Sequence, residues 1–298
     1  MRPAPAGRCC FWPGITASRS VRLPCTPRGI RVQLRFSITI ATLYMAASRF
    51  DASPIPEQTM PDWQCASQLP IATDAVRPLQ PASLASAFRT HPIYFKLGVP
   101  GAVPECFVRT EVYQRLLTAA QTLPAGITLV VLDGWRPLEV QRHLYTTLLG
   151  LVTQRFAALD EATRREHIRG FVALPSDDPL CPSPHLTGAA VDVTLCDEHG
   201  LLFDMGTAFD EMHAASHTCY FETLTAPSAA ERECRERRRM LYHAMTQAGF
   251  ANLPSEWWHY SFGDQLWAWM GGHEQALFGK SEPYTLEARW RHSLSLMS

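Results

Sequence analysis

The 298-residue chain has very little lysine and no excess of either charge. Lys96 and Lys280 are its only lysines, so arginine carries almost all of the positive charge, and the formal net charge is −1. A chain in which neither sign dominates has no general attraction to nucleic acid or to an anionic membrane. We therefore expect a small molecule as its partner. We assign the arginine bias to the coding DNA.

Long apolar runs, paired cysteines and nucleotide fingerprints are also missing. No run of 18 apolar residues is present, which predicts that the protein does not span a membrane. The nine cysteines form an odd set without a CxxC pair, so neither a disulfide framework nor a cysteine zinc site is indicated. A reduced, cytoplasmic setting is expected. Residues 36–48 look like the apolar part of an export signal, so a periplasmic location is the alternative.

The first fifth of the chain does not look like domain material. Residues 1–50 hold eight Arg and no Lys, Asp or Glu, and they show no sustained helical or strand period. Met45 or Met60 could be the true start. We predict that residues 1–60 are a leader, disordered or a mis-called start. Residues 61–298 are then expected to form a single catalytic domain, a length that suits one substantial core.

Hydrophobic spacing predicts a helix, a strand and a second helix in the middle of the chain. Apolar residues recur at helical spacing over 110–123, and 127–133 is a β-branched run typical of a buried strand. Pro137 is well placed as the first residue of a helix that Gly150 would end. Arg136 is therefore expected at a strand–helix junction, where side chains can point into a cleft.

Further elements are expected towards the C-terminus. Residues 151–170 are predicted to be helical and 171–182 to form a loop broken by proline. Apolar and polar residues alternate over 189–195, which predicts a half-buried strand with Asp192 facing away from the valines. Residues 227–250 are predicted to be a long helix whose arginines pair with interleaved glutamates on a solvated face.

The stretch SPHLTGAAVD carries one imidazole and one carboxylate seven positions apart. A zinc ion used for hydrolysis takes three protein ligands and leaves a position for water. His185 and Asp192 can supply two ligands, and Gly188 would let the backbone turn tightly so that they converge. His259 is the best third candidate, because Glu256 lies three residues before it among aromatic side chains.

Two more charged residues suit peptide hydrolysis. A carboxylate beside the metal can take a proton from water and return it to the leaving amine, and we assign this role to Glu256. For Glu256 and His259 to face the same metal ion, SEWWHY must bend, because positions three apart do not share a face of a strand. Arg136, in DGWRP, is our candidate for stabilising the negative charge that builds on the carbonyl oxygen.

These residues resemble a known pattern. SxHxxGxAxD followed by ExxH is similar to the D-alanyl-D-alanine dipeptidase branch of the zinc D-Ala-D-Ala peptidases, the VanX-like family. The other matching blocks are DGWRP (133–137), DMGTAFDEM (204–212) and RRRMLYHAMTQAGF running into SEWWHY (237–260). The blocks occur in the right order over roughly residues 88–268, which makes the resemblance specific.

The resemblance implies a fold and a set of residue roles. The implied fold is α+β, with helices packed on a mainly antiparallel sheet that carries a mononuclear zinc site. One zinc ion per subunit would be held by His185, Asp192 and His259. Glu256 would be the general base, and Arg136 would polarise the scissile carbonyl.

The resemblance also assigns two substrate contacts. Asp210 would anchor the free α-ammonium of the substrate, and Ser183 would help to hold the small dipeptide. A dipeptidase must recognise an amine only one residue from the cut, so an acidic residue in a closed pocket makes physical sense. A role as a cap or turn residue is the alternative for both.

The leading hypothesis is a zinc-dependent D-alanyl-D-alanine dipeptidase that hydrolyses the free dipeptide to two D-alanines in peptidoglycan precursor metabolism. One alternative is a muropeptide D,D- or L,D-carboxypeptidase of the same superfamily, against which Asp210 argues. A non-catalytic zinc-binding module is the other, and it would have no need of Glu256 and Arg136.

The chain departs from the family pattern in three places. The usual Asn-Phe near the start of the domain is Tyr94-Phe95 here, a long insert separates the Arg136 helix from His185, and the leader has no counterpart. These departures concern substrate fit more than catalysis.

Overall fold

A computed structural model describes residues 51–72, 79–169, 172–283 and 285–297. By their contacts these residues all fall within one unit, Ala47–Ser298. The predicted leader up to residue 50, with its signal-like stretch, lies outside the described residues. The helices are α2 (Trp63–Ala66), α3 (Ile93–Lys96), α4 (Thr110–Thr122), α5 (Leu138–Arg155), α6 (Glu161–Arg169), α7 (Ala229–Gln247), α8 (Gln265–Met270) and α9 (Leu286–Ser295).

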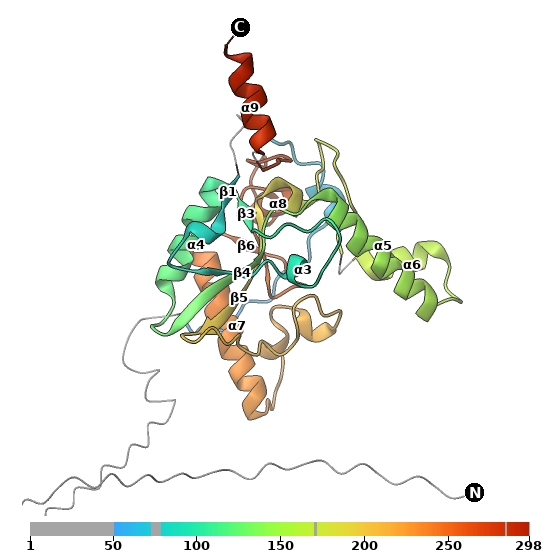
Figure 1. Cartoon of the computed structure of the whole chain (residues 1–298). Coiled ribbons are helices and arrows are strands. Elements are labelled where there is room, and N and C mark those ends of the chain that lie inside the picture. Colours follow the sequence, from blue (N-terminus) through green and yellow to red (C-terminus); the bar gives the residue numbers. More distant parts are fainter. Residues whose placement is uncertain (1–50, 73–78, 170–171, 284, 298) are drawn as a thin grey trace, which may run out of the picture. The chain divides into compact units, whose positions relative to one another are not determined.

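A mixed sheet runs through the centre of this unit (Figure 1). The strands are β1 (Gln80–Pro81), β2 (Arg89–Thr90), β3 (Phe107–Val108), β4 (Ile127–Asp133), β5 (Ala190–Asp197), β6 (Ala251–Asn252) and β7 (His259–Ser261). Five of them form one sheet in the order β2-β4-β5-β7-β6, and β1 pairs with β3. Within the larger sheet only β2 and β4 are parallel. The expected α+β class with a mainly antiparallel sheet is confirmed.

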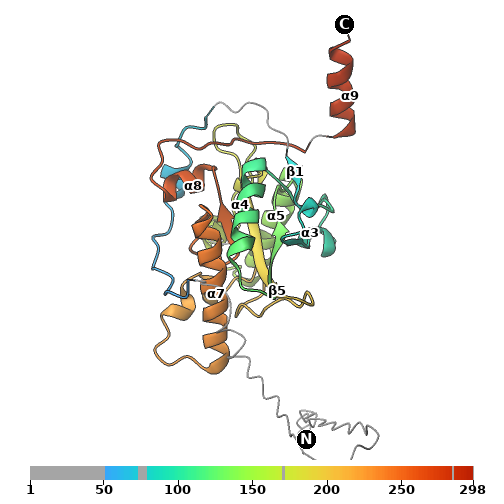
Figure 2. The same cartoon turned by 90° about the vertical axis from the view of Figure 1, so that its left-hand side faces the viewer.

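Two helices cover one face of the sheet. Figures 1 and 2 show α4 and α7 side by side against β4 and β5. Leu116 of α4 and Met245 of α7 pack in one buried cluster with Val191 and Val193 of β5. Burying these side chains contributes on the order of 1.5–3 kcal/mol each, so this cluster holds the strands of the site in place.

A bulge interrupts the pairing of β4, whose bounds match the predicted strand, with β5. Val131 lies opposite Val193, but Asp133 lies opposite Asp192, so Leu132 is an extra residue on β4. Residues paired across antiparallel strands point to the same face of the sheet. The bulge therefore turns the Asp133 side chain to the face that carries Asp192.

Strand β5 is buried on both faces, and the expectation of a half-buried strand is wrong. Val191 and Val193 face α4 and α7, as the alternation predicts. Asp192 faces the other way, and this second face is also covered, because Cys196 packs there near Phe209.

Helix α5 continues through Gly150 to Arg155, so the predicted end is wrong. A glycine inside a helix costs roughly 1 kcal/mol relative to alanine. Leu148 and Val152 pack against Ile168 of α6, and this contact offsets the cost. The predicted helix over 151–170 is therefore the end of α5 followed by α6.

Helix α7 (Ala229–Gln247) lies within the predicted helical range 227–250. The Ser228 side chain accepts a hydrogen bond from the Glu231 backbone, and the Glu231 side chain accepts one from the Ser228 backbone, which is a capping box. Arg237 pairs with Glu233 one turn away, at 3.1 Å, as expected of a solvated face.

Arg238 departs from the predicted solvated face, because it is buried. Its guanidinium donates to the carbonyl oxygens of Met205 and His217 and lies against the ring of Trp257. Arg238 thus ties both ends of the loop that carries Asp210 to α7.

A tight turn follows the 3-10 helix η2 (Pro184–Thr187), as the sequence predicts. Gly188 has φ 70°, in the left-handed region that favours glycine. Its carbonyl accepts a hydrogen bond from the backbone of Arg109, and a Cβ there would collide with the side chain of Leu79. The turn sets the direction in which His185 enters the sheet face.

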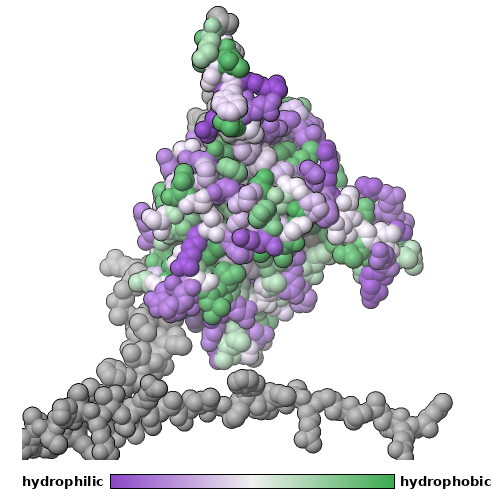
Figure 3. All heavy atoms as spheres, in the orientation of Figure 1, coloured by the Kyte–Doolittle hydropathy of each residue, from purple (hydrophilic) through white to green (hydrophobic). Residues whose placement is uncertain are grey.

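Among the described helices, none has the length and apolar character needed to cross a bilayer. The face seen in Figure 3 intersperses hydrophilic and hydrophobic residues. The most exposed leucines, such as Leu84, Leu180 and Leu201, lie on different segments.

We predict that Gly188→Ala lowers the free energy of unfolding by about 1–3 kcal/mol, because alanine is strained at this φ and would meet Leu79. Urea denaturation measures the change. Gly150→Ala is the matched control, since its Cβ would meet nothing within 4 Å, and it should stabilise α5 by roughly 0.5–1 kcal/mol. Equal stability of Gly188→Ala and the wild type would contradict the strain argument.

Candidate metal centre

Three neighbouring strands place acidic and imidazole side chains in one row across the sheet. Asp133 on β4 lies opposite Asp192 on β5, and Asp192 lies opposite His259 on β7. All three therefore point to the same face. His185 reaches this row from η2, just before the Gly188 turn.

The three predicted ligands converge. His185 Nε2 lies 3.2 Å from His259 Nδ1 and 3.5 Å from Asp192 Oδ1, and His259 Nδ1 lies 3.2 Å from the same oxygen. Tetrahedral zinc with bonds near 2.0–2.1 Å places its ligand atoms about 3.3 Å apart. Asp192 Oδ1 is buried and accepts no hydrogen bond. The spacing and this bare oxygen fit a His-Asp-His site for one divalent metal ion.

The outer ring nitrogens of both histidines have partners that orient the rings. His185 Nδ1 donates to the Gly134 carbonyl at 2.8 Å, which leaves the lone pair on Nε2 pointing inward. His259 Nε2 lies 3.4 Å from the Ser261 hydroxyl, which donates to Asp264 at 2.7 Å. Such partners fix the tautomer and direction of a metal-binding imidazole.

Asp192 is held in its ionised form. Burial alone would raise its pKa, but His185 and His259 lower the pKa further than burial raises it. Its second oxygen, Oδ2, lies 3.1 Å from the guanidinium of Arg136. An ionised carboxylate is the form that binds a metal.

Glu256 lies beside the cluster in a turn that precedes β7. The His259 backbone donates to the Glu256 carbonyl at 3.3 Å, so the bend that the hypothesis requires is present. Glu256 Oε2 lies 3.8 Å from His259 Nδ1. Burial, and then the charges of Asp192 and Asp210, raise the pKa of Glu256 well above its ordinary value. A raised pKa strengthens a carboxylate as a proton acceptor.

Arg136 stands at the predicted strand–helix junction with its guanidinium fixed on several sides. It donates from Nε to Asp133 and from NH1 to Gln141, each at 2.7 Å, and from NH2 to Asp192 at 3.1 Å. Burial alone would lower the pKa of Arg136, but Tyr94, Asp133 and Asp192 raise it above the ordinary arginine value. The guanidinium is therefore a permanent, oriented charge beside the metal cluster.

Asp210 joins the same network from an exposed loop. Its Oδ2 accepts a hydrogen bond from the Tyr94 hydroxyl at 2.6 Å, and that hydroxyl accepts one from Arg136 at 3.3 Å. Protein atoms packed around the carboxylate raise the pKa of Asp210. The candidate ammonium anchor is thus two hydrogen bonds away from Arg136.

Ser183 is buried two residues before His185. Its hydroxyl accepts a hydrogen bond from the Ser176 backbone at 2.8 Å and lies 3.2 Å from the Leu174 carbonyl. These partners belong to the inserted loop, so Ser183 ties that loop to the site. Its contact with substrate stays a prediction.

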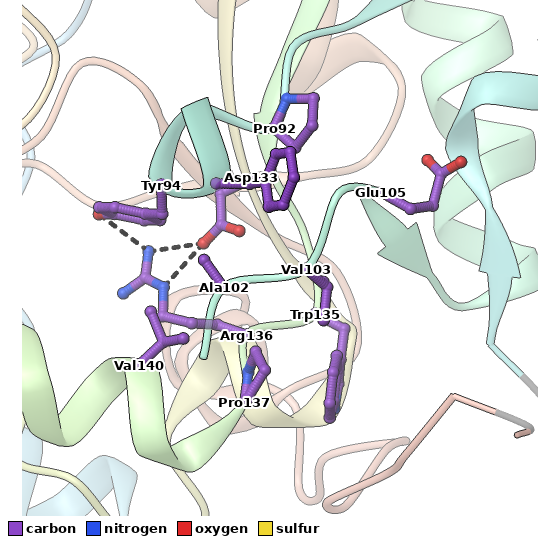
Figure 4. Close-up of a pocket in the computed structure, with 11 residues that line it drawn as sticks. Pro92, Tyr94, Ala102, Val103, Glu105, Asp133, Trp135, Arg136, Pro137 and Val140 are labelled. Atoms are coloured by element: carbon purple, nitrogen blue, oxygen red, sulfur yellow. Dashed lines mark hydrogen bonds and ion pairs between the residues drawn. The ribbon is translucent and has the colours of Figure 1, made fainter. Parts of the chain in front are cut away.

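A pocket opens beside Arg136 (Figure 4). Tyr94, Asp133, Trp135 and Arg136 are among the residues that line it. The figure shows the guanidinium between the Tyr94 hydroxyl and the Asp133 carboxylate. The cavity therefore adjoins the candidate catalytic arginine.

Sequence reasoning missed five residues that orient the predicted ones: Asp133, Gln141, Tyr94, Ser261 and Asp264. Asp133 had a usable signal, because it opens the DGWRP block three positions before Arg136. Tyr94 was noticed only as a departure from the family pattern. The other three lie within five positions of the residues they orient, but no sequence motif marks them.

We predict that Ser261→Ala weakens zinc binding about tenfold, because the His259 ring loses the hydroxyl that links it to Asp264. Chelator competition measures the affinity, and circular dichroism checks that the variant is folded. Ser293→Ala is the control, since its hydroxyl bonds within its own exposed helix. Unchanged zinc affinity in Ser261→Ala would refute the orienting role.

Comparison with known proteins finds one family and several relatives. The family described as D-ala-D-ala dipeptidase, peptidase M15, matches residues 100–276. A D-alanyl-D-alanine dipeptidase of Synechocystis sp. is 35% identical over 237 residues, covering 74% of this chain and 92% of the relative. Enzymes of the same name from Escherichia coli and Enterococcus faecium are 35% and 37% identical, covering 46% and 52% of this chain and 55% and 72% of their own lengths.

A solved structure of a mutant of the vancomycin-resistance D,D-pentapeptidase VanY, in complex with Zn(II), aligns with a TM-score of 0.37 and 16% identity. The alignment covers 68% of this chain and 90% of that one.

Proposed function

The chain belongs to the D-ala-D-ala dipeptidase family of M15 peptidases, and from this we propose that it is a zinc-dependent hydrolase that cleaves free D-Ala-D-Ala into two D-alanines. Relatives named D-alanyl-D-alanine dipeptidase support this substrate. Two D-alanines would return to, or be withdrawn from, the pool of peptidoglycan precursors.

His185, Asp192 and His259 would hold the zinc ion through Nε2, Oδ1 and Nδ1, the atoms that converge. When bound, zinc supplies a Lewis acid that makes water acidic enough to attack near neutral pH and polarises the scissile carbonyl. The donor set of two imidazoles and one carboxylate suits a catalytic rather than a purely structural zinc.

Glu256 moves the proton. It takes one proton from the attacking water and delivers it to the nitrogen of the second D-alanine, so the amine leaves in neutral form. The next two residues in the chain, Trp257 and Trp258, are buried and give this segment an apolar surround. Glu256 is close enough to His259, at 3.8 Å, to serve a substrate placed at the metal cluster.

Arg136 stabilises the negative charge that develops on the carbonyl oxygen. Asp133 and Gln141 hold the guanidinium in place before substrate arrives, so little reorganisation is needed during the reaction. Asp210 would take the α-ammonium of the first D-alanine, and Ser183 would help to hold the dipeptide.

The observation that carries the proposal is the hydrogen-bonded path from Asp210 through Tyr94 to Arg136 and on to Asp192. Along this path, the carboxylate that we assign to the amine is two hydrogen bonds from the guanidinium that we assign to the carbonyl. A peptide with a free amine one residue from the cut would engage both ends at once.

The test is hydrolysis by the zinc-loaded chain of D-Ala-D-Ala, N-acetyl-D-Ala-D-Ala and a tetrapeptide ending in D-Ala-D-Ala. Cleavage of the free dipeptide at least about 100-fold faster, in kcat/KM, than of the other two is expected, because only it fits an amine anchor. Comparable rates on all three would favour a carboxypeptidase. Zinc binding without any cleavage would indicate a binding module.

Glu256→Gln should lower kcat by on the order of 10²–10⁴-fold, the usual contribution of a general base. Its zinc content, measured by elemental analysis, should stay at one ion per chain. Glu233→Gln, on the exposed face of α7, is the control and should keep full activity. Full activity of Glu256→Gln would remove this residue from the mechanism.

We also propose that residues 61–298 form the catalytic domain and that the enzyme works in the cytoplasm. A chain starting at Met60 should cleave the dipeptide, although it should be less stable, because Ser53 and Gln58 bond to His243 and Tyr242 of α7. Loss of activity in a folded truncated chain would contradict this boundary. Fractionation of the cells would test the compartment.

A further inference from the structure

Tyr94 stands between two groups to which the mechanism gives separate tasks. It belongs to α3, beside β4, and is 5% exposed. The Arg136 guanidinium carbon lies 4.7 Å from the centre of its ring, and the edge of the ring packs against Phe209, the neighbour of Asp210. Figure 4 shows the hydroxyl end of the ring at the guanidinium.

The Tyr94 hydroxyl satisfies both neighbours with one proton and one lone pair. It donates to Asp210 Oδ2 at 2.6 Å and accepts from Arg136 NH2 at 3.3 Å. Burial raises the pKa of Tyr94 well above its ordinary value, so the phenol keeps its proton. A protonated hydroxyl can act only in this direction, since a guanidinium never accepts and an ionised carboxylate never donates.

Asp210 depends on this contact for its orientation. In the described part of the chain it is the one non-glycine residue with a positive φ, 61°. Such a conformation persists only where surrounding contacts hold it. The Tyr94 hydroxyl is the one described group that hydrogen-bonds its side chain. Oδ2 is thereby engaged, which leaves Oδ1 to bind a ligand.

We propose that Tyr94 is a positioning residue that sets the distance between the ammonium anchor Asp210 and the carbonyl-stabilising Arg136, and so makes the site selective for a free amine one residue from the cut. The proposal rests on the proposed function. It gives a role to a position at which the family pattern has asparagine, whose amide is shorter and carries no ring.

Kinetic constants measured on a substrate with a free amine and on one with a blocked amine distinguish this role from a general structural role. In Tyr94→Phe the ring stays and the hydroxyl is lost. The KM for D-Ala-D-Ala should rise on the order of tenfold, the effect of losing a hydrogen bond to a charged group, while kcat falls less than about threefold. The kcat/KM for N-acetyl-D-Ala-D-Ala should stay within about twofold of wild type, because that substrate makes no ammonium contact.

A double-mutant cycle identifies the residue through which Tyr94 acts. Tyr94→Phe should add little to the loss already caused by Asp210→Asn, because the two changes remove one interaction. Tyr113→Phe is the matched control; Tyr113 lies on α4 and packs against Phe88, and the change should leave all constants unaltered. Equal losses on both substrates, or additive losses in the cycle, would overturn the proposal.

Binding without turnover keeps this test separate from that of the proposed function. Calorimetry with D-Ala-D-Ala should show a Kd about tenfold higher for Tyr94→Phe than for wild type, both in a Glu256→Gln background. If the chain with Glu256 intact bound the dipeptide but did not cleave it, the proposed function would be wrong. The comparison of Kd values would still decide the role of Tyr94. An unchanged Kd, or no binding at all, would overturn the role of Tyr94.

Discussion

The site depends on the register of three antiparallel strands. Asp192 is opposite His259 on one side and, because of the bulge at Leu132, opposite Asp133 on the other. A slip of one residue in either pairing would turn a side chain to the α4 and α7 face and break the row. The buried cluster of Val191, Val193 and their helix partners opposes such a slip, so the core fixes the chemistry through register.

Charge balance explains why these side chains can share so small a space. Four carboxylates, those of Asp133, Asp192, Asp210 and Glu256, surround the single guanidinium of Arg136 in the network described here. Burial raises the pKa of Glu256, and the nearby charges of Asp192 and Asp210 raise it further. A divalent ion and a substrate ammonium supply the positive charge that this arrangement calls for. The same excess of carboxylates would therefore account for both the proposed metal site and the proposed preference for an amine.

Short sequence motifs and local hydrophobic patterns predicted the metal-site residues and the strand β4. His185, Asp192, His259 and Glu256 stand in short blocks, and β4 was found from its β-branched run alone. The bend before His259 was required by the hypothesis and is present.

Long-range contacts account for what the sequence could not reveal. The extra residue in β4 arises from pairing with β5, and the continuation of α5 through Gly150 arises from packing on α6. The burial of Arg238 arises from its hydrogen bonds to the loop between Met205 and His217. The role of Tyr94 is of the same kind, because Asp210 lies 116 positions away.

The central claim is that two imidazoles and one carboxylate bind one zinc ion. X-ray absorption at the zinc edge of the loaded protein tests it most directly. The account predicts only nitrogen and oxygen neighbours at about 2.0–2.1 Å, with the outer-shell scattering of imidazole. Sulfur at about 2.3 Å would place the ion on cysteines instead and contradict the account.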